Sequence, residues 1–136
     1  MNEACAAILA KRFGADSLMA LATVDETGNP WVRTIDAIFV GDSFYTITHG
    51  SSHKMEHLRR DPRAAISGDW FSGHALCASL GHVAAEENRE MADRLRAAFA
   101  AWYDNGHTDE SDPQTVILRI RLTDGILYDH GTRYVF

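Results

Sequence analysis

Residues 17–40 read SLMALATVDETGNPWVRTIDAIFV, and this stretch decides the fold. It holds two apolar runs, 17–24 and 31–40, on either side of the turn-forming residues 25–30. Apolar runs of this length, separated by a Gly-Asn-Pro cluster, are typical of two β-strands joined in a hairpin. Gly41 and Asp42 then predict a tight turn into a third strand over residues 44–48.

Outward from this hairpin, the chain predicts three helices and four more strands. The helices are expected over 2–13, 53–60 and 86–103, the last one amphipathic, and the strands over 64–70, 75–85, 115–122 and 126–129, with turns at 72–73 and 123–125. About seven antiparallel strands usually close into a barrel or sandwich, because closure removes their edges. We therefore expect an α+β fold built on a small antiparallel barrel with peripheral helices, in one domain over residues 1–136.

The charge balance limits the partners that the surface can bind. The 136 residues include 19 acidic and 13 basic side chains, a formal charge of −6, which argues against a nucleic-acid or anionic-membrane surface spread over the whole molecule. No apolar run approaches the roughly 20 residues that span a bilayer. Two cysteines make no disulfide framework, and Glu3 precedes Lys11 and Arg12, the reverse of the charge order in a secretory signal. We expect a cytoplasmic protein.

The strongest chemical signal is the stretch THGSSHK at residues 48–54, where a strand ends and a helix begins. Free N–H groups at the helix start, the hydroxyls of Thr48 and Ser52, and the ammonium of Lys54 together suit a phosphate. Lys54 is one of only two lysines in the chain, and three arginines follow it by residue 63. The same pattern also fits a serine-capped surface helix with solvated bases.

Arg33 is the second signal, because it lies among apolar neighbours within the predicted strand 31–40. A buried arginine requires an anionic or planar partner. That partner is either a ligand or a carboxylate such as Asp36. Asp36 is itself unusual in an apolar strand. Three explanations stay open: a pair with Arg33, a contact with a second subunit, or a place at the sheet edge.

Taken together, these segments resemble the pyridoxamine 5'-phosphate oxidase-like, FMN-binding split-barrel family, especially its short members related to general stress proteins. The resemblance runs from about Ser17 to Asp129. Its evidence is the order and spacing of LMALAT (18–23), GNP (28–30), Arg33, FYTIT (44–48), SHK (52–54) and LRRDPR (58–63), followed by Trp70 and Gly81.

The resemblance implies a homodimer of split barrels with two FMN molecules at the subunit interface. Arg33 and Lys54 would bind the FMN phosphate with help from Ser52, and Thr48 would lie against the phosphate or the ribityl chain. The remaining residues that it assigns to the cofactor site are Thr34, Ile35 and Asp36 beside the isoalloxazine, His53 next to the phosphate lysine, and Trp70 close to the site.

Several departures separate this chain from the oxidases of that family. His53 stands where they have an arginine before the phosphate lysine, Ile38 where they have a substrate-binding lysine, and Leu76 where they have a flavin-contacting glutamine. Residues 131–136 lack their arginine and histidine for the vitamin substrate. The resemblance therefore implies a flavin-dependent oxidoreductase that does not oxidise pyridoxamine phosphate.

Two further functions stay open beside hydride or electron transfer between FMN and a small molecule. One is a non-catalytic module that holds flavin, haem or the deazaflavin F420 as a carrier or sensor. The other is a dimeric interaction domain, in which the Ser52–Lys54 pocket would be empty or closed. His53 and His57 lie four residues apart, but the glutamate of the metalloprotease pattern is missing, so we assign no metal site and no catalytic side chain.

Overall fold

The computed structural model describes residues 1–136. In chain order its elements are α1 (Glu3–Phe13), β1 (Ser17–Val24), β2 (Pro30–Val40), β3 (Ser43–His49), α2 (His53–Arg60), β4 (Arg63–Gly68), β5 (Phe71–His82), the short 3-10 helix η1 (Glu86–Asn88), α3 (Arg89–Ala98), β6 (Thr115–Asp129) and β7 (Thr132–Val135). None of these helices has both the length and the apolar character that crossing a membrane requires.

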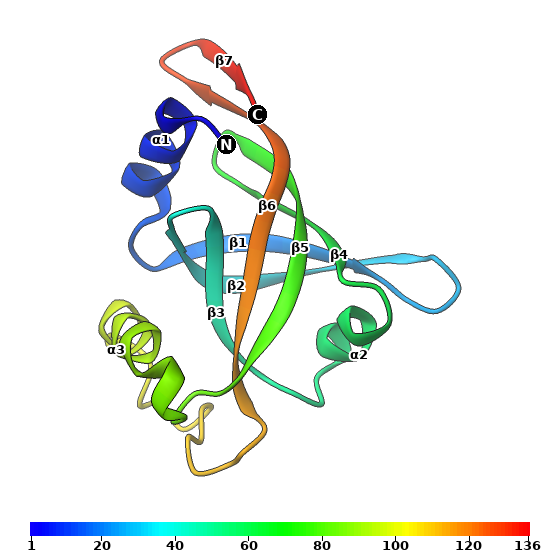
Figure 1. The fold of residues 1–136 in the computed structure, drawn as a ribbon, viewed down its shortest axis with the longest axis vertical. Helices are drawn as coiled ribbons and strands as arrows, with labels where there is room; N and C mark the ends of the chain where they lie inside the picture. The colour runs from blue at the N-terminus through cyan, green and yellow to red at the C-terminus, as the bar shows by residue number, and fades with distance from the viewer.

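The seven strands form one antiparallel sheet in the order β3-β2-β1-β4-β5-β6-β7. β3 also pairs with β6 along its whole length, from Ser43 to His49, so that β1 to β6 close into a barrel. β7 pairs with the end of β6 and forms a hairpin that extends beyond the barrel. The helices lie around the outside and the ends of the barrel (Figure 1). The predicted α+β fold on a small antiparallel barrel is confirmed.

The β1–β2 hairpin has the predicted bounds, with Val24 opposite Pro30. Its turn is held by Asp25, whose carboxylate accepts hydrogen bonds from the backbone N–H groups of Thr27 at 2.9 Å and Asn29 at 3.0 Å, and from Trp31 Nε1 at 2.9 Å. These hydrogen bonds hold the pKa of Asp25 well below its usual range, and the bond from Trp31 has the largest effect. The hairpin is therefore a rigid arm at the end of the barrel where Arg33 lies.

Helix α1 contributes the apolar stripe Cys5, Leu9 and Phe13 to the barrel core. The spacing of four residues places these side chains on one helix face. Phe13 then packs against Phe44 and Phe71, with ring centroids 5.7 and 5.9 Å apart. Full burial of side chains of this size stabilises the fold by about 1.5–3 kcal/mol each.

The predicted turns at 72–73 and 123–125 are wrong, because both segments continue as strands. The β4–β5 turn lies at residues 69–70 instead, and β6 runs unbroken to Asp129 with a bulge opposite His74. Gly73 faces Gly125 across the β5–β6 pair, and a Cβ at Gly125 would lie 3.0 Å from the Ser72 carbonyl oxygen. These two glycines permit close packing of neighbouring backbones, a role that sequence alone does not distinguish from a turn.

The predicted helix over 86–103 is shorter than expected. Asn88 does not cap α3 with its side chain, because Nδ2 donates to the carbonyls of Leu80 and His82 at 2.9 Å each. α3 then ends at Ala98, and the chain continues in turns. The apolar stripe of the helix packs on the outside of the barrel, where Leu95 and Phe99 join Ile117 in a second hydrophobic cluster.

Candidate functional site

Arg33 lies in β2, directly opposite Leu21 of β1, with its side chain half-buried. Its Nη1 donates to Thr23 Oγ1 at 2.6 Å and, less closely, to the carbonyls of Trp31 at 3.3 Å and Leu21 at 3.4 Å. Burial alone lowers the pKa of Arg33, and no carboxylate, Asp36 included, opposes that effect. The other guanidinium nitrogens have no protein acceptor and are free to bind an anion.

Helix α2 begins beside Arg33 and presents an unused hydroxyl. Ser52 is the N-cap residue, yet its side chain makes no capping bond. Ser52 Oγ is the one buried side-chain nitrogen or oxygen in the chain without a hydrogen-bond partner, a condition that costs about 1–3 kcal/mol. The first-turn N–H groups also lack acceptors within the helix, so this end of α2 presents donors without acceptors.

Lys54 adds a second cation in the first turn of α2. Its side chain is half-buried, and burial lowers its pKa, an effect that the neighbouring Arg33 charge increases. No carboxylate acts in the opposite direction. Arg33 and Lys54 therefore lie close enough to repel each other and have no acidic partner in the chain.

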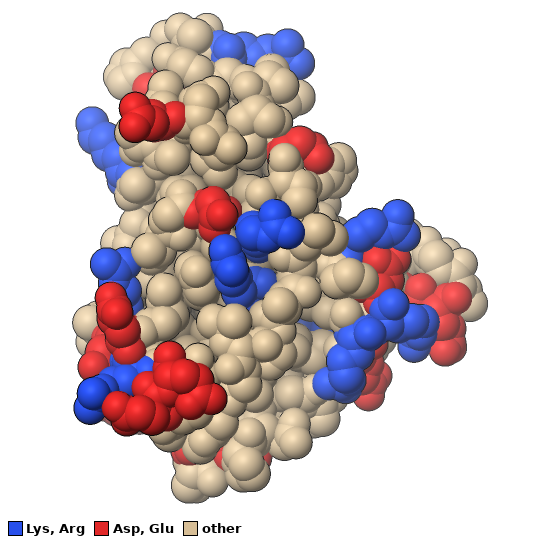
Figure 2. Space-filling view, in the orientation of Figure 1, with Lys and Arg blue, Asp and Glu red and all other residues tan.

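The set formed by Arg33, Ser52, Lys54 and the first-turn N–H groups is named the phosphate-type site below. It consists of donors and positive charge, with two cations and an orphan hydroxyl, and this chemistry fits a phosphate dianion such as that of FMN. On the face seen in Figure 2, blue basic groups lie apart and mostly next to red acidic ones.

Thr23 and His57 form a buried polar pair behind Arg33. Their exposed fractions are only 1% and 3%, and Thr23 Oγ1 lies 2.8 Å from His57 Nδ1. Burial first, and the charges of His53 and Arg33 next, lower the pKa of His57. A neutral imidazole thus lies against the hydroxyl that holds the Arg33 guanidinium.

His53, which the resemblance places next to the phosphate lysine, is exposed at the start of α2. Its ring lies edge-on to Trp31, with centroids 5.0 Å apart, and 4.1 Å from the ring of His57. The two histidines do share a helix face, but His57 Nδ1 is bonded to Thr23. No group of three or more histidine, cysteine or acidic side chains in the chain is arranged to hold a metal ion.

Thr34, Ile35 and Asp36 follow Arg33 along β2 and differ in exposure. Thr34 is exposed, Ile35 is buried in the barrel core and Asp36 is half-buried. The pKa of Asp36 is raised to about 6, mainly by burial. A hydrogen bond with Asp16 and the charge of Asp16 raise it further. The charged neighbour that acts on Asp36 is therefore another carboxyl group, that of Asp16, and not Arg33.

Thr48 is not joined to the phosphate-type site in the structure. It is buried in β3 opposite Val116 of β6, and it lines a cavity of about 250 Å³ together with His49 and Asp112. No hydrogen bond connects it with Arg33, Ser52 or Lys54. Its contact with the phosphate or ribityl chain stays a prediction.

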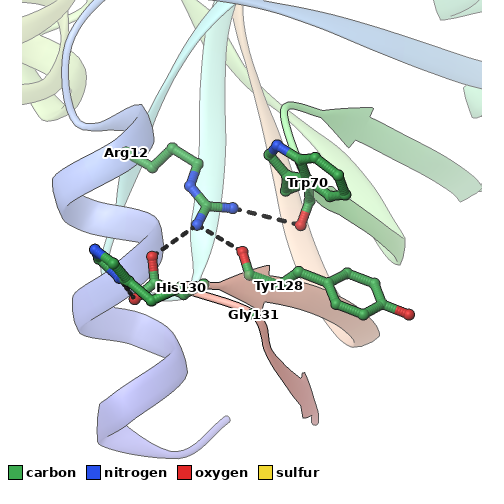
Figure 3. A pocket seen from close by; sticks show the side chains of 6 residues that line it. Arg12, Trp70, Tyr128, His130 and Gly131 are labelled. Carbon is green, nitrogen blue, oxygen red and sulfur yellow. Dashed lines mark hydrogen bonds and ion pairs between the residues drawn. The ribbon is translucent and has the colours of Figure 1, made fainter.

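Trp70 lies in a different region, shown in Figure 3. It is 74% exposed and borders a pocket of about 350 Å³ with Arg12, Tyr128 and His130. β4 connects α2 to the turn that contains Trp70, and its six residues span about 20 Å. Within one chain, Trp70 and the end of α2 therefore lie at opposite ends of β4, and no hydrogen bond or aromatic contact joins Trp70 to Arg33, Ser52 or Lys54.

The residues that sequence analysis missed are Thr23 and His57. Thr23 had a detectable signal, because the hairpin register that pairs Leu21 with Arg33 places Thr23 diagonally across from Arg33 on the same face. His57 had none, since its bond to Thr23 joins residues 34 positions apart. The structure thus brings Lys54 into the field of Arg33, with Ser52 two residues before Lys54 at the start of α2, and adds a buried support behind Arg33.

Comparison with known families gives a match along most of the chain. The family described as pyridoxamine 5'-phosphate oxidase has a model that matches residues 1–128. No curated protein matches the sequence.

Solved structures with the same fold include proteins with different named ligands. General stress protein 26 from Bacillus anthracis has a TM-score of 0.70 at 12% identity, with 97% of each chain covered. A FAD-binding protein from Mesorhizobium loti has a TM-score of 0.69 at 14% identity, with 92% of each chain covered. A heme-binding protein from Mycobacterium smegmatis has a TM-score of 0.69 at 16% identity, covering 96% of this chain and 57% of that one. At these identities the likeness establishes a shared fold.

Proposed function

Because the chain belongs to the pyridoxamine 5'-phosphate oxidase family, we propose that it is an FMN-binding oxidoreductase acting on a small molecule. The observation that supports FMN most strongly is the phosphate-type site. Arg33 and Lys54 have no acidic partner. Ser52 Oγ is buried and has no hydrogen-bond partner. A phosphate would neutralise both cations and, once the Ser52 side chain turns toward it, accept a hydrogen bond from the hydroxyl.

Each residue of the site has a distinct part in binding. The Arg33 guanidinium offers its unused nitrogens as a fork to two phosphate oxygens, whereas the Lys54 ammonium acts as a point charge. Ser52 donates its hydroxyl proton, and the N-terminus of α2 adds its dipole. The β2 backbone at residues 34–36 would border the ring. When bound, the flavin supplies the hydride or electron chemistry, and the protein orients it.

The proposal includes a homodimer, with the cofactor between the subunits. Two observations support it. The outer faces of β1 and β2 expose Leu18 by 70% and Val32 by 69%, and apolar exposure of this kind is common at subunit interfaces. Trp70 packs against Tyr128 rather than at the phosphate-type site of its own chain, and a second copy would bring it to that site. Sedimentation equilibrium of the purified chain would give twice the monomer mass, and a monomer at micromolar concentration would contradict the dimer.

The direct test is an FMN titration followed by flavin fluorescence. We expect the wild-type protein to bind FMN, and the double variant Arg33→Ala plus Lys54→Ala to lose that binding. Lys11→Ala is a matched control, because Lys11 is an exposed lysine at the far end of α1. A wild-type protein that ignores added FMN would contradict the proposal.

A carrier or sensor is the second candidate. The similar folds include one named for FAD and one named for heme, so this architecture serves more than one ligand. The spectrum of the protein as purified distinguishes flavin, haem and deazaflavin. Steady oxidation of NADH or NADPH with an added acceptor would support the enzyme, and a bound flavin without any turnover would support the carrier.

A further inference from the structure

The support behind Arg33 is a chain of two hydrogen bonds through buried side chains. Arg33 Nη1 lies 2.6 Å from Thr23 Oγ1, which lies 2.8 Å from His57 Nδ1. Thr23 and His57 are both almost fully buried. Neither belongs to the set of free donors at the phosphate-type site.

The direction of both bonds follows from the chemistry of the three groups. A guanidinium only donates, so Thr23 Oγ1 accepts from Arg33. The Thr23 hydroxyl can then give its own proton to His57 Nδ1, provided that this nitrogen is unprotonated. The groups acting on His57 favour its neutral form: burial and the charges of His53, Arg33 and Arg60 lower its pKa, and only Asp25 raises it. Because Arg33 can only donate, His57 Nδ1 is the one acceptor within reach of the Thr23 hydroxyl proton, and we therefore assign the His57 proton to Nε2.

We propose that Thr23 and His57 are positioning residues, which hold the Arg33 guanidinium with its free nitrogens turned toward a bound phosphate. This inference rests on the proposed function, since it concerns the same site. Without the Thr23 hydroxyl, the remaining acceptors of Nη1 are carbonyls at 3.3 and 3.4 Å, at the long limit of hydrogen bonding. An arginine held so loosely would lose more rotamer freedom when it binds.

The test compares FMN with riboflavin, which lacks the phosphate, by fluorescence titration. Thr23→Val removes the hydroxyl and keeps the shape, and we expect it to weaken FMN binding about tenfold while leaving riboflavin binding unchanged. Thr23→Ser retains the hydroxyl and should stay close to wild type. His57→Leu should weaken FMN binding by a smaller factor, and His57→Asn, which keeps an acceptor near Nδ1, should restore part of it.

A double-mutant cycle separates positioning from general damage to the fold. In an Arg33→Ala background, Thr23→Val should have no further effect on FMN binding. Ser43→Ala is the matched control, because Ser43 is also buried and its hydroxyl accepts from the Arg119 guanidinium, at the end of β3 away from α2. It should leave the ratio of FMN to riboflavin affinity unchanged, even where thermal unfolding shows lost stability.

The outcomes distinguish this inference from the proposed function. Equal weakening of FMN and riboflavin by Thr23→Val, or weakening that persists without Arg33, would overturn the positioning role. If Lys54→Ala weakens FMN binding and Thr23→Val does not, the positioning role is overturned while the proposed function stands. A wild-type protein that binds no FMN would overturn the proposed function and this inference with it.

Discussion

Two half-buried arginines, Arg12 and Arg33, have opposite relations to the protein around them. Arg12 donates to the carbonyls of Asp69 at 3.0 Å, Trp70 at 3.4 Å and Tyr128 at 2.8 Å, and pairs with Asp129 at 3.1 Å (Figure 3). Arg33 uses one nitrogen only and has no carboxylate. The first guanidinium uses both terminal nitrogens on its own chain and ties α1 to the β6–β7 end of the barrel. The second is left ready for an anion.

This contrast shows how a structural cation differs from a binding one. Burial alone does not distinguish them, and neither does residue type. The number of acceptors that the chain supplies does, because a buried donor without an acceptor costs free energy that a ligand can recover. Substitutions at the two ends of the barrel should therefore have opposite consequences.

The largest effect is expected at Arg33. Arg33→Ala should weaken FMN binding about 100-fold, or about 2.7 kcal/mol, while the free energy of unfolding of the ligand-free protein changes little. FMN titration and urea unfolding measure the two quantities. An Arg33→Ala variant that binds FMN with the wild-type affinity would show that Arg33 does not bind the phosphate.

The reverse is expected at Arg12. Arg12→Ala removes four contacts of the guanidinium, three with carbonyls and one with the Asp129 carboxylate, so it should lower the free energy of unfolding by about 2 kcal/mol. The ratio of FMN to riboflavin affinity should stay at its wild-type value. A change in that ratio would show that the two ends of the barrel are not independent.

A third effect concerns the acidic counterpart of the Arg33–Lys54 pair, Asp16 and Asp36. Because the pKa of Asp36 is raised to about 6 in the folded chain, and lies near 4 when unfolded, its contribution is most favourable below about pH 4 and is lost as the pH rises through 6. After allowance for solvent screening, Asp36→Asn should stabilise the protein by about 1 kcal/mol at pH 7.5 and hardly at all at pH 4. Urea unfolding at both pH values checks this, and an equal difference at the two would contradict it.

The smallest effect is expected at Lys54. Lys54→Met keeps the length of the side chain and removes one of two repelling charges, so it should raise the free energy of unfolding by about 0.5 kcal/mol. The same variant should bind FMN more weakly. Loss of both stability and affinity would mean that Lys54 has an acidic partner in solution.

Sequence reasoning succeeded where local pattern decides the structure. The hairpin over 17–40 and the start of α2 follow from turn residues and short connections, whereas only the resemblance placed Arg33 and Lys54 at one site. It failed where contacts between distant segments decide the structure. Gly73 and Gly125 were mistaken for turns because their role depends on packing across strands.

The same limit applies to the candidate site. Ser52 and Lys54 could be found because they are neighbours in the chain, whereas the Thr23–His57 bond joins two distant segments. Trp70 is assigned to the site only by resemblance, and one chain places it at the end of β4 away from α2, about 20 Å along the strand. A site shared by two subunits has no signature in the spacing of one sequence.

The central claim is that the phosphate-type site recognises a flavin by its phosphate. The most direct measurement is the ratio of FMN to riboflavin affinity in the wild-type protein and in the Arg33→Ala plus Lys54→Ala variant. We predict that the wild-type protein binds FMN at least about 100-fold more tightly than riboflavin, and that the ratio falls close to one in the variant. Equal affinities for FMN and riboflavin in the wild-type protein would contradict the claim.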